Sequence, residues 1–495
     1  MTKFQKRGEF YSSPLFIFDK MLKLYADFEK MRILCLFFLL GANFILNAQP
    51  FVHIGKITVE GNRKTRTEII LRELRFNVGD SIPLQALDTF CRESEQLILN
   101  TGLFNKASVT IQPCESCLPN TMTARVWVDE AWYLYPVPIF ELADRNFNVW
   151  WVEQDRSLQR INFGTEFTHL NISGRADRLK IGAKYGYTHN YTLRYNLPYI
   201  NKNQTIGLSA DISYSQNREV NYATAGNKQL FYRDSSNFIY STFRSVLGMT
   251  YRPGLRTYHY FNLGFYQNRI SDFISDELNP HFFLNGENMQ RFFSFSYQFV
   301  YDERDVRPYP MNGKYVSVRL ERDGLGIYND RNSLTLLTYY DQYFSFSPKW
   351  SLGLKTGSKV SLIRTQQPYN DNRALGFGKN HLHGFEYYVI DGTDMGFVKS
   401  SLRFQVLKEE INFGKLVPIR QFRSMPIKTY ISLNSDWGYV NEPFLRENNF
   451  LVNQLLWGGG IGLDFVFFYD KVLQIEYSIN HLKEKGIFLN INLNL

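Results

Sequence analysis

The sequence predicts a mainly β protein, in which a small α+β domain precedes a transmembrane antiparallel β-barrel of about 16 strands. Aromatic residues make up 16% of the 495 residues, yet the mean hydropathy is −0.30, which does not suit a bundle of apolar membrane helices. From about residue 133 onward, apolar and polar residues alternate over many short segments. Alternation of this kind is typical of strands with one apolar and one polar face.

The alternation is clearest in residues 206–214, in residues 293–301 and at the chain end. A soluble sandwich would also alternate, but here the apolar face is rich in aromatic side chains and the chain ends on a strand. About 360 residues, at roughly 20–25 per strand with its loop, give about 16 strands over residues 133–495. The apolar face of the predicted last strand consists of Ile487, Leu489, Ile491, Leu493 and Leu495.

Residues 51–130 are predicted to form the small α+β domain. Residues 51–61 alternate as a strand, and residues 67–74 (TEIILREL) form a short helix. Pro83 opens a second helix that ends at Gly102. Two further strands, KASVTIQ and TARVWVDE, complete the domain.

The N-terminus carries a predicted export signal. Residues 31–48 contain a basic start, the apolar stretch 33–45 and small residues before a cleavage site after Ala48, as in a secretory signal peptide. Residues 1–30 are then expected to be a non-native extension, with Met31 as the true start; the alternative is an unusually long n-region. The net charge of +9 is scattered along the chain, which favours solvated faces or a polar lumen over nucleic-acid binding.

Export implies an oxidising compartment for the cysteines. Cys114 and Cys117 could close a small disulfide in the loop between the two last strands of the domain, and free thiols are the alternative. A zinc site would need two further ligands nearby, and the sequence offers none there.

The order β-α-α-β-β, with ITVEGNRKT, VGD and LNTGLF at their places in residues 51–130, resembles a POTRA domain. The stretches YPVPIFELADRNFNVWW, YDERDVRPYPMNGKYVSVRLERDG and WGGGIGLDFVFF resemble the barrel of the Omp85 family, also called bacterial surface antigen D15. This resemblance implies a bacterial outer-membrane barrel with its POTRA domain in the periplasm, no cofactor and no catalysed reaction. The implied partners are the outer-membrane bilayer, unfolded or secreted client proteins and periplasmic accessory proteins.

The resemblance also implies a set of lumen residues. In the family, an extracellular loop folds into the barrel and carries a V-R-G-F/Y motif, which Leu382, His383, Gly384 and Phe385 match with His in place of Arg. Asp436 resembles the lumen aspartate of the family and is the expected partner of His383.

Three more charged residues are expected in the lumen. Asp302 and Arg304 match the family's D-x-R-D strand, and alternation is expected to turn both inward into a charge network. Arg403, if it also faces inward, would disfavour a second loop cation and so favour His383 over arginine.

Other interpretations of the loop are weaker. A metal site from His381, His383 and Asp436 is an alternative, whereas no nucleophile motif supports a catalytic histidine.

The resemblance predicts a factor that assembles, inserts or translocates outer-membrane proteins, with the POTRA domain capturing clients by edge pairing. A weakly paired seam between the first barrel strand, near residues 141–151, and the last, residues 487–495, is expected to open laterally. Alternatives are a secretion transporter, a specialised lipid or surface-protein exporter, and a passive porin or receptor.

Overall fold

The computed structural model describes residues 50–113, 121–307, 309–328, 330–414, 423–446, 449–467 and 471–492. The predicted extension 1–30, the signal peptide 31–48, Cys114, Cys117, Leu493 and Leu495 lie outside the described residues, as does the side chain of Ile491. Among the described residues, no helix combines the length and apolar character needed to cross a membrane.

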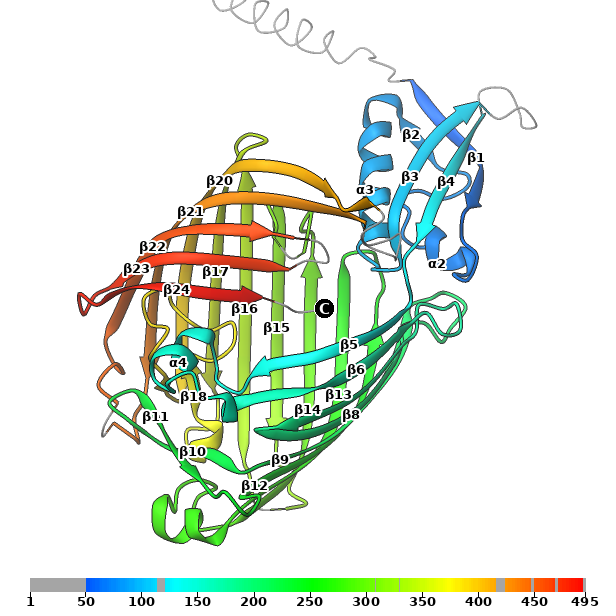
Figure 1. The fold of residues 1–495 in the computed structure, drawn as a ribbon. Helices are drawn as coiled ribbons and strands as arrows, with labels where there is room; N and C mark the ends of the chain where they lie inside the picture. Colours follow the sequence, from blue (N-terminus) through cyan, green and yellow to red (C-terminus); the bar gives the residue numbers. More distant parts are fainter. Residues whose placement is uncertain are drawn as a thin grey trace, which may run out of the picture.

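The N-terminal domain is a four-stranded sheet in the order β2-β1-β4-β3, covered by helix α3 (Figure 1). Parallel pairing of β1 with β4 places the first and last strands at the centre of the sheet. Its core is apolar and fully buried, with Ile54, Ile98 and Val126 at 0% exposure. The elements are β1 (Phe51–Glu60), α2 (Thr67–Leu71), β2 (Ser81–Pro83), η1 (Leu84–Ala86), α3 (Leu87–Leu99), β3 (Phe104–Pro113) and β4 (Thr121–Glu130).

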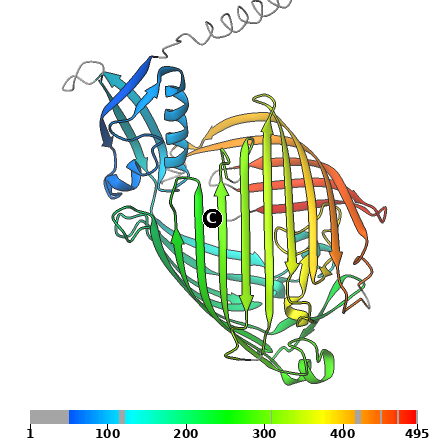
Figure 2. The ribbon, with the colours of Figure 1, turned by 180° about the vertical axis from the view of Figure 1, so that it is seen from behind.

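One 16-stranded antiparallel sheet curls into a barrel, so the predicted fold class and strand number are confirmed (Figures 1 and 2). β5 stands at one end of the sheet order and β24 at the other. The strands are β5 (Leu134–Leu142), β6 (Ile161–Leu170), β7 (Arg178–Gly186), β8 (Thr188–Leu197), β9 (Ile206–Asn217), β12 (Tyr240–Tyr251), β13 (Thr257–Ile270), β14 (Met289–Asp302), β15 (Gly313–Asp323), β16 (Ser333–Ser345), β17 (Trp350–Ser361), β20 (Asp394–Asn412), β21 (Ser424–Asn441), β22 (Leu455–Val466), β23 (Val472–Asn480) and β24 (Lys485–Asn492).

The remaining described elements lie in the connections between barrel strands. Four of these elements are strands that form two separate antiparallel pairs, and the other four are single helical turns or short helices. They are α4 (Phe147–Val152), η2 (Leu158–Arg160), β10 (Glu219–Ala225), β11 (Lys228–Arg233), η3 (Ile274–Leu278), η4 (Tyr369–Asp371), β18 (Arg373–Leu375) and β19 (Ile390–Asp391).

The two faces of the barrel differ as alternation predicts. Leu208, Ile212 and Phe295 are exposed on the outer face, where a barrel meets lipid. Ser294 and Ser296, which alternate with Phe295 on β14, are buried on the inner face. The lumen is therefore lined mainly by polar and charged side chains.

The prediction that the first barrel strand lies near residues 141–151 is wrong. β5 ends at Leu142, and Phe147–Val152 form the helix α4. The side chain of Asn146 accepts a hydrogen bond from the Val149 N–H (2.9 Å), which caps the helix N-terminus. The ring of Phe147 packs on those of Trp150 and Trp151, and these contacts at helical spacing hold the segment as a helix.

The N-terminal domain is docked on one rim of the barrel (Figures 1 and 2). We call this rim, which includes residues 171–177, 198–205 and 252–256, the domain-side rim. Glu73 of the domain and Arg252 of the barrel are both buried and form a two-point ion pair, with N–O distances of 2.5 and 2.8 Å. Asn171 donates to the Thr65 hydroxyl in a second buried contact (2.8 Å). The domain is therefore held in one orientation by desolvated polar contacts.

Candidate functional site

The seam between β5 and β24 is the first part of the candidate site. These strands are the two ends of the barrel sheet, and within the described residues no backbone hydrogen bond joins them. Every other neighbouring pair in the sheet is joined by an antiparallel ladder, which is interrupted only by an irregularity between Gln405 and Leu407 of β20. The barrel therefore has two strand edges that face each other without a ladder, with helix α4 beside β24 (Figure 1).

The second part is the segment of residues 376–391, which folds into the barrel and which we call the lumen loop. Leu382 and Phe385 are buried against Val440 of β21 and Leu456 of β22. Gly384 adopts a φ of +81°, a conformation that favours glycine, and its carbonyl accepts a hydrogen bond from Asn480 Nδ2 (2.7 Å). The loop is thus held by apolar packing and by polar contacts to the strands next to the seam.

His383 is the charged centre of this loop. Its Nδ1 lies 2.7 Å from Asp436 Oδ2, and its Nε2 lies 3.1 Å from Glu476 Oε2. Its backbone N–H donates to the same Asp436 oxygen (3.0 Å), while Lys399 Nζ lies 3.7 Å from that oxygen. Burial disfavours the charged imidazolium, but Asp436 and then Glu476 outweigh it, so the pKa of His383 is raised above its ordinary value.

Two glycines in the barrel wall make room for the loop. Gly458 of β22 lies opposite Asp436, and a Cβ there would come within 1.8 Å of the His383 carbonyl oxygen. A Cβ at Gly438 of β21 would lie 2.6 Å from Leu382 Cδ1. Glycine inside a strand often marks such a close approach, so the glycines of the WGGGIG segment are the signal in the sequence for this contact.

The structure separates the other expected lumen residues from His383. The cation beside the His383 cluster is Lys399, whereas Arg403 donates to the Pro310 carbonyl (2.9 Å) and stacks over Tyr309. Tyr309 and Pro310 belong to the β14–β15 connection at the domain-side rim, which the structure describes at residues 303–307 and 309–312. Tyr309 is buried and donates to Asp464 (2.6 Å), so this connection also reaches into the lumen.

Asp302 and Arg304 form an ion pair away from His383, and Arg307 Nε also lies 3.1 Å from Asp302 Oδ2. The guanidinium of Arg304 binds both carboxylate oxygens of Asp302, at 2.8 and 2.9 Å, and stacks over the Tyr315 ring. β14 ends at Asp302, so Arg304 lies in the following turn and strand alternation does not place it. The pair braces this turn at the domain-side rim.

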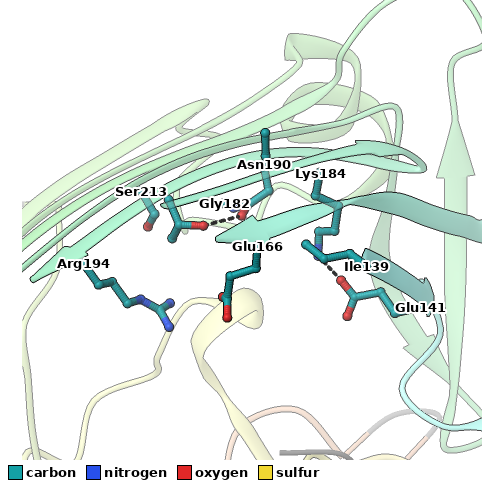
Figure 3. Close-up of a pocket in the computed structure, with 10 residues that line it drawn as sticks. Ile139, Glu141, Glu166, Gly182, Lys184, Asn190, Arg194 and Ser213 are labelled. Carbon is teal, nitrogen blue, oxygen red and sulfur yellow. Dashed lines mark hydrogen bonds and ion pairs between the residues drawn. The ribbon is translucent and has the colours of Figure 1, made fainter. Parts of the chain in front are cut away.

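Open space remains in the lumen. A cavity of about 920 Å³ is lined by both inward segments, including Tyr309 and His383, and by charged wall residues such as Lys355 and Arg403. A separate cavity of about 200 Å³ lies along β5–β9, where Glu141, Glu166, Lys184 and Arg194 extend toward the same space (Figure 3). The lumen is polar and partly filled, but it is not packed solid.

His383 interacts with Asp436 and Glu476 as a cation with two carboxylates. His381 does not join these residues, because its Nδ1 lies 3.0 Å from the Gly378 carbonyl oxygen and its ring is 6.2 Å from that of His383. In the part of the chain that the structure describes, no three His, Cys, Asp or Glu side chains are grouped to hold a metal ion.

Replacing His383 by alanine is expected to loosen the lumen loop by about 2 kcal/mol, the scale of a hydrogen bond to a charged group. Because the folded pKa is raised, the stabilisation is complete below the ordinary pKa of about 6.5 and is lost as pH rises through the folded value. Protease cleavage within residues 376–391 should therefore rise more strongly at pH 6 than at pH 9. His381→Ala is the matched control, and equal cleavage of the His383 variant and the parent at pH 6 would refute the anchoring role.

Two family models match the chain. The Omp85 superfamily domain matches residues 171–414, within the barrel, and the POTRA model, described as a surface antigen variable number repeat, matches residues 52–129. A search of curated proteins finds no match to this sequence.

Solved structures share the fold at low sequence identity. BamA from Haemophilus ducreyi lacking POTRA domains 1–3 is 14% identical with a TM-score of 0.50, covering 89% of this chain and 83% of that one. CdiB from Escherichia coli is 11% identical with a TM-score of 0.55, covering 89% of this chain and 75% of that one. With one POTRA domain, a 16-stranded barrel and both family matches, the chain belongs to the Omp85 superfamily of outer-membrane β-barrel proteins.

Proposed function

We propose that this protein inserts or exports other proteins at the outer membrane, and that extended client segments enter through the seam between β5 and β24. The observation that carries the proposal is the missing ladder between these strands in an otherwise continuous sheet. A strand edge in lipid leaves backbone groups without partners, which is unfavourable unless another segment pairs with it. A client strand supplies such a segment without any catalysed reaction or cofactor.

The POTRA domain supports the same function. Its sheet ends in β3, whose outer edge can pair with an extended peptide. The buried Glu73–Arg252 pair holds this domain against the barrel rim, on the periplasmic side in this proposal. A captured segment would thus be presented beside the barrel with a fixed geometry.

Two segments that lie inside the lumen argue against a secretion transporter that uses the lumen and against a passive porin. The lumen loop and residues 309–310 of the β14–β15 connection both project into the barrel, each held by buried polar contacts. A secretion transporter that uses the lumen, or a passive porin, would have to displace both segments. Lateral entry at the seam leaves them in place, so we favour it over passage through the lumen.

Bridging the seam is expected to abolish insertion while the barrel stays folded. In a background with the native cysteines changed to serine, Phe140→Cys on β5 is combined with Ile487→Cys on β24, since both side chains are exposed on the outer face. A short bifunctional maleimide reagent then joins them. The measurement is the folding rate of a urea-denatured eight-stranded outer-membrane barrel in liposomes that contain this protein.

The matched control bridges two strands that are already paired. Phe140 and Phe163 are cross-strand neighbours on β5 and β6, and both are exposed. The parent and the bridged Phe140–Phe163 variant should accelerate folding of the added barrel, and the bridged seam should not. Undiminished acceleration by a verified bridged seam contradicts lateral entry, and no acceleration by the parent contradicts the insertion function.

A further inference from the structure

The two edges of the seam differ in their capacity to pair. Leu170 N–H donates to the Tyr133 carbonyl (2.7 Å), and Ala143 N–H donates to the Arg160 carbonyl (2.8 Å). With the β5–β6 register, these bonds assign the odd-numbered residues of β5 to the ladder with β6. The even-numbered residues therefore direct their backbone groups to the seam.

The seam edge of β5 has few backbone groups free to pair with an added strand. Pro136 and Pro138 are even-numbered residues of β5 and have no N–H to donate. The carbonyl of Leu134, the next even-numbered residue toward the N-terminus, accepts a hydrogen bond from the Trp132 indole. Three neighbouring pairing positions on the seam edge of β5 are thus blocked or occupied.

β24 has a complete edge. Asn480 N–H donates to the Glu484 carbonyl (3.0 Å), and the register then assigns even-numbered residues of β24 to the ladder with β23. Lys485, Ile487, Leu489 and Ile491 direct their backbone groups to the seam, and none of them is proline. β24 can therefore both donate to and accept from an added strand.

One of these positions is already filled by a side chain. Leu489 N–H donates to Asn148 Oδ1 (3.0 Å), and Asn148 Nδ2 donates to the Leu489 carbonyl (3.4 Å). A hydrogen-bonded pair of antiparallel strands exchanges the same two bonds, so the buried amide of Asn148 takes the place of one residue of a neighbouring strand.

The helix that carries Asn148 is tied to the lumen loop. Asn146 Nδ2 donates to the Glu386 carbonyl (2.8 Å), and Arg145 Nη1 donates to the Gly376 carbonyl (3.3 Å). The position of α4 at β24 thus depends on the loop that His383 anchors. Release of the loop would remove the support of the Asn148 amide.

We propose that β24, and not β5, is the strand that receives an extended segment of a client barrel, and that Asn148 is its resident cap, which the client backbone displaces. This inference rests on the proposed function, because it names the edge that the client uses. The occupant is an extended peptide, since only a backbone offers alternating donors and acceptors to Leu489 and its neighbours at once.

Asn148→Ala is expected to speed amide exchange in residues 485–492 by about tenfold, the effect of losing roughly one net hydrogen bond. Asn148→Asp keeps the acceptor for Leu489 N–H and should have a smaller effect. Val152→Ala, on an exposed residue of the same helix, is the control and should leave exchange unchanged. Hydrogen–deuterium exchange measured by mass spectrometry needs no client, and unchanged exchange in Asn148→Ala overturns the cap.

The receiving strand is tested with a peptide of the sequence of β23, residues 472–480, a strand that in the fold occupies the opposite edge of β24. A photo-reactive phenylalanine replaces either Ile487 on β24 or Phe140 on β5. Cross-linking should occur at position 487, rise several-fold with Asn148→Ala and stay at background at position 140. Cross-linking mainly at position 140 overturns the inference. If the parent accelerates barrel folding but the peptide reaches neither strand, this inference fails while the proposed function stands.

Discussion

Replacing Gly458 by alanine is expected to expel the lumen loop from its place in the barrel. The added Cβ would lie 1.8 Å from the His383 carbonyl oxygen, a backbone atom that cannot rotate away. Overpacking of this kind costs about 3 kcal/mol, and the contacts of His383 with Asp436 and Glu476 are lost together. Protease cleavage within residues 376–391 should increase by at least about a hundredfold, since each 1.4 kcal/mol is a factor of ten.

The matched control for this variant is Gly396→Ala. Gly396 also lies within a strand, β20, but a Cβ there meets no atom within 4 Å. Its gel mobility, with and without heating, and its loop cleavage should equal those of the parent. A Gly458 variant that is cleaved no faster than the Gly396 variant would show that the loop does not depend on this contact.

Replacing Glu73 by alanine is expected to release the POTRA domain from the barrel rim. The variant removes the carboxylate from the buried Arg252 guanidinium, whose remaining partners among the described residues are the Tyr199 hydroxyl, the Leu255 carbonyl and the Tyr258 ring. Removing one member of a buried ion pair costs about 3–5 kcal/mol, because the remaining charge is not compensated. The distance distribution between spin labels on α3 and on β14 should broaden, while the unfolding of the barrel stays unchanged.

An exposed pair in the same domain provides the comparison. Glu60 and Arg125 also form an ion pair, but their side chains are 50% and 51% exposed, so Glu60→Ala should have little effect. A distance distribution in Glu73→Ala as narrow as that in Glu60→Ala would show that other contacts hold the domain.

The sequence was informative where structure depends on local periodicity. Alternation over segments such as residues 206–214 predicted the barrel and its two faces, because a strand needs only a period of two to separate lipid from lumen. The residue pattern was misleading at residues 147–152, because an aromatic-rich segment taken alone is typical of a strand. The Asn146 cap and the contacts of Phe147 with Trp150 and Trp151 decide for a helix.

Non-local contacts could not be predicted from spacing. The family resemblance suggested Asp436 beside His383, but nothing in the chain links His383 to Glu476 or singles out Lys399. The meaning of Pro136 and Pro138 likewise depends on which side of β5 pairs with β6, and this requires the register. Such features arise only once distant strands are neighbours.

The lengths of the strands also shape the surrounding bilayer. β5 and β23 have 9 residues each, whereas β13 and β14 have 14 each. At about 3.3 Å per residue and a tilt of about 40°, the short strands rise only about 23 Å and the long ones about 35 Å. An outer-membrane barrel typically carries an apolar band about 25 Å tall, so lipids beside the short strands must shorten or tilt to match the wall. We therefore expect the membrane to be thinnest beside β5 and β23, near the seam, where a hairpin's polar turn would have the least hydrocarbon to cross.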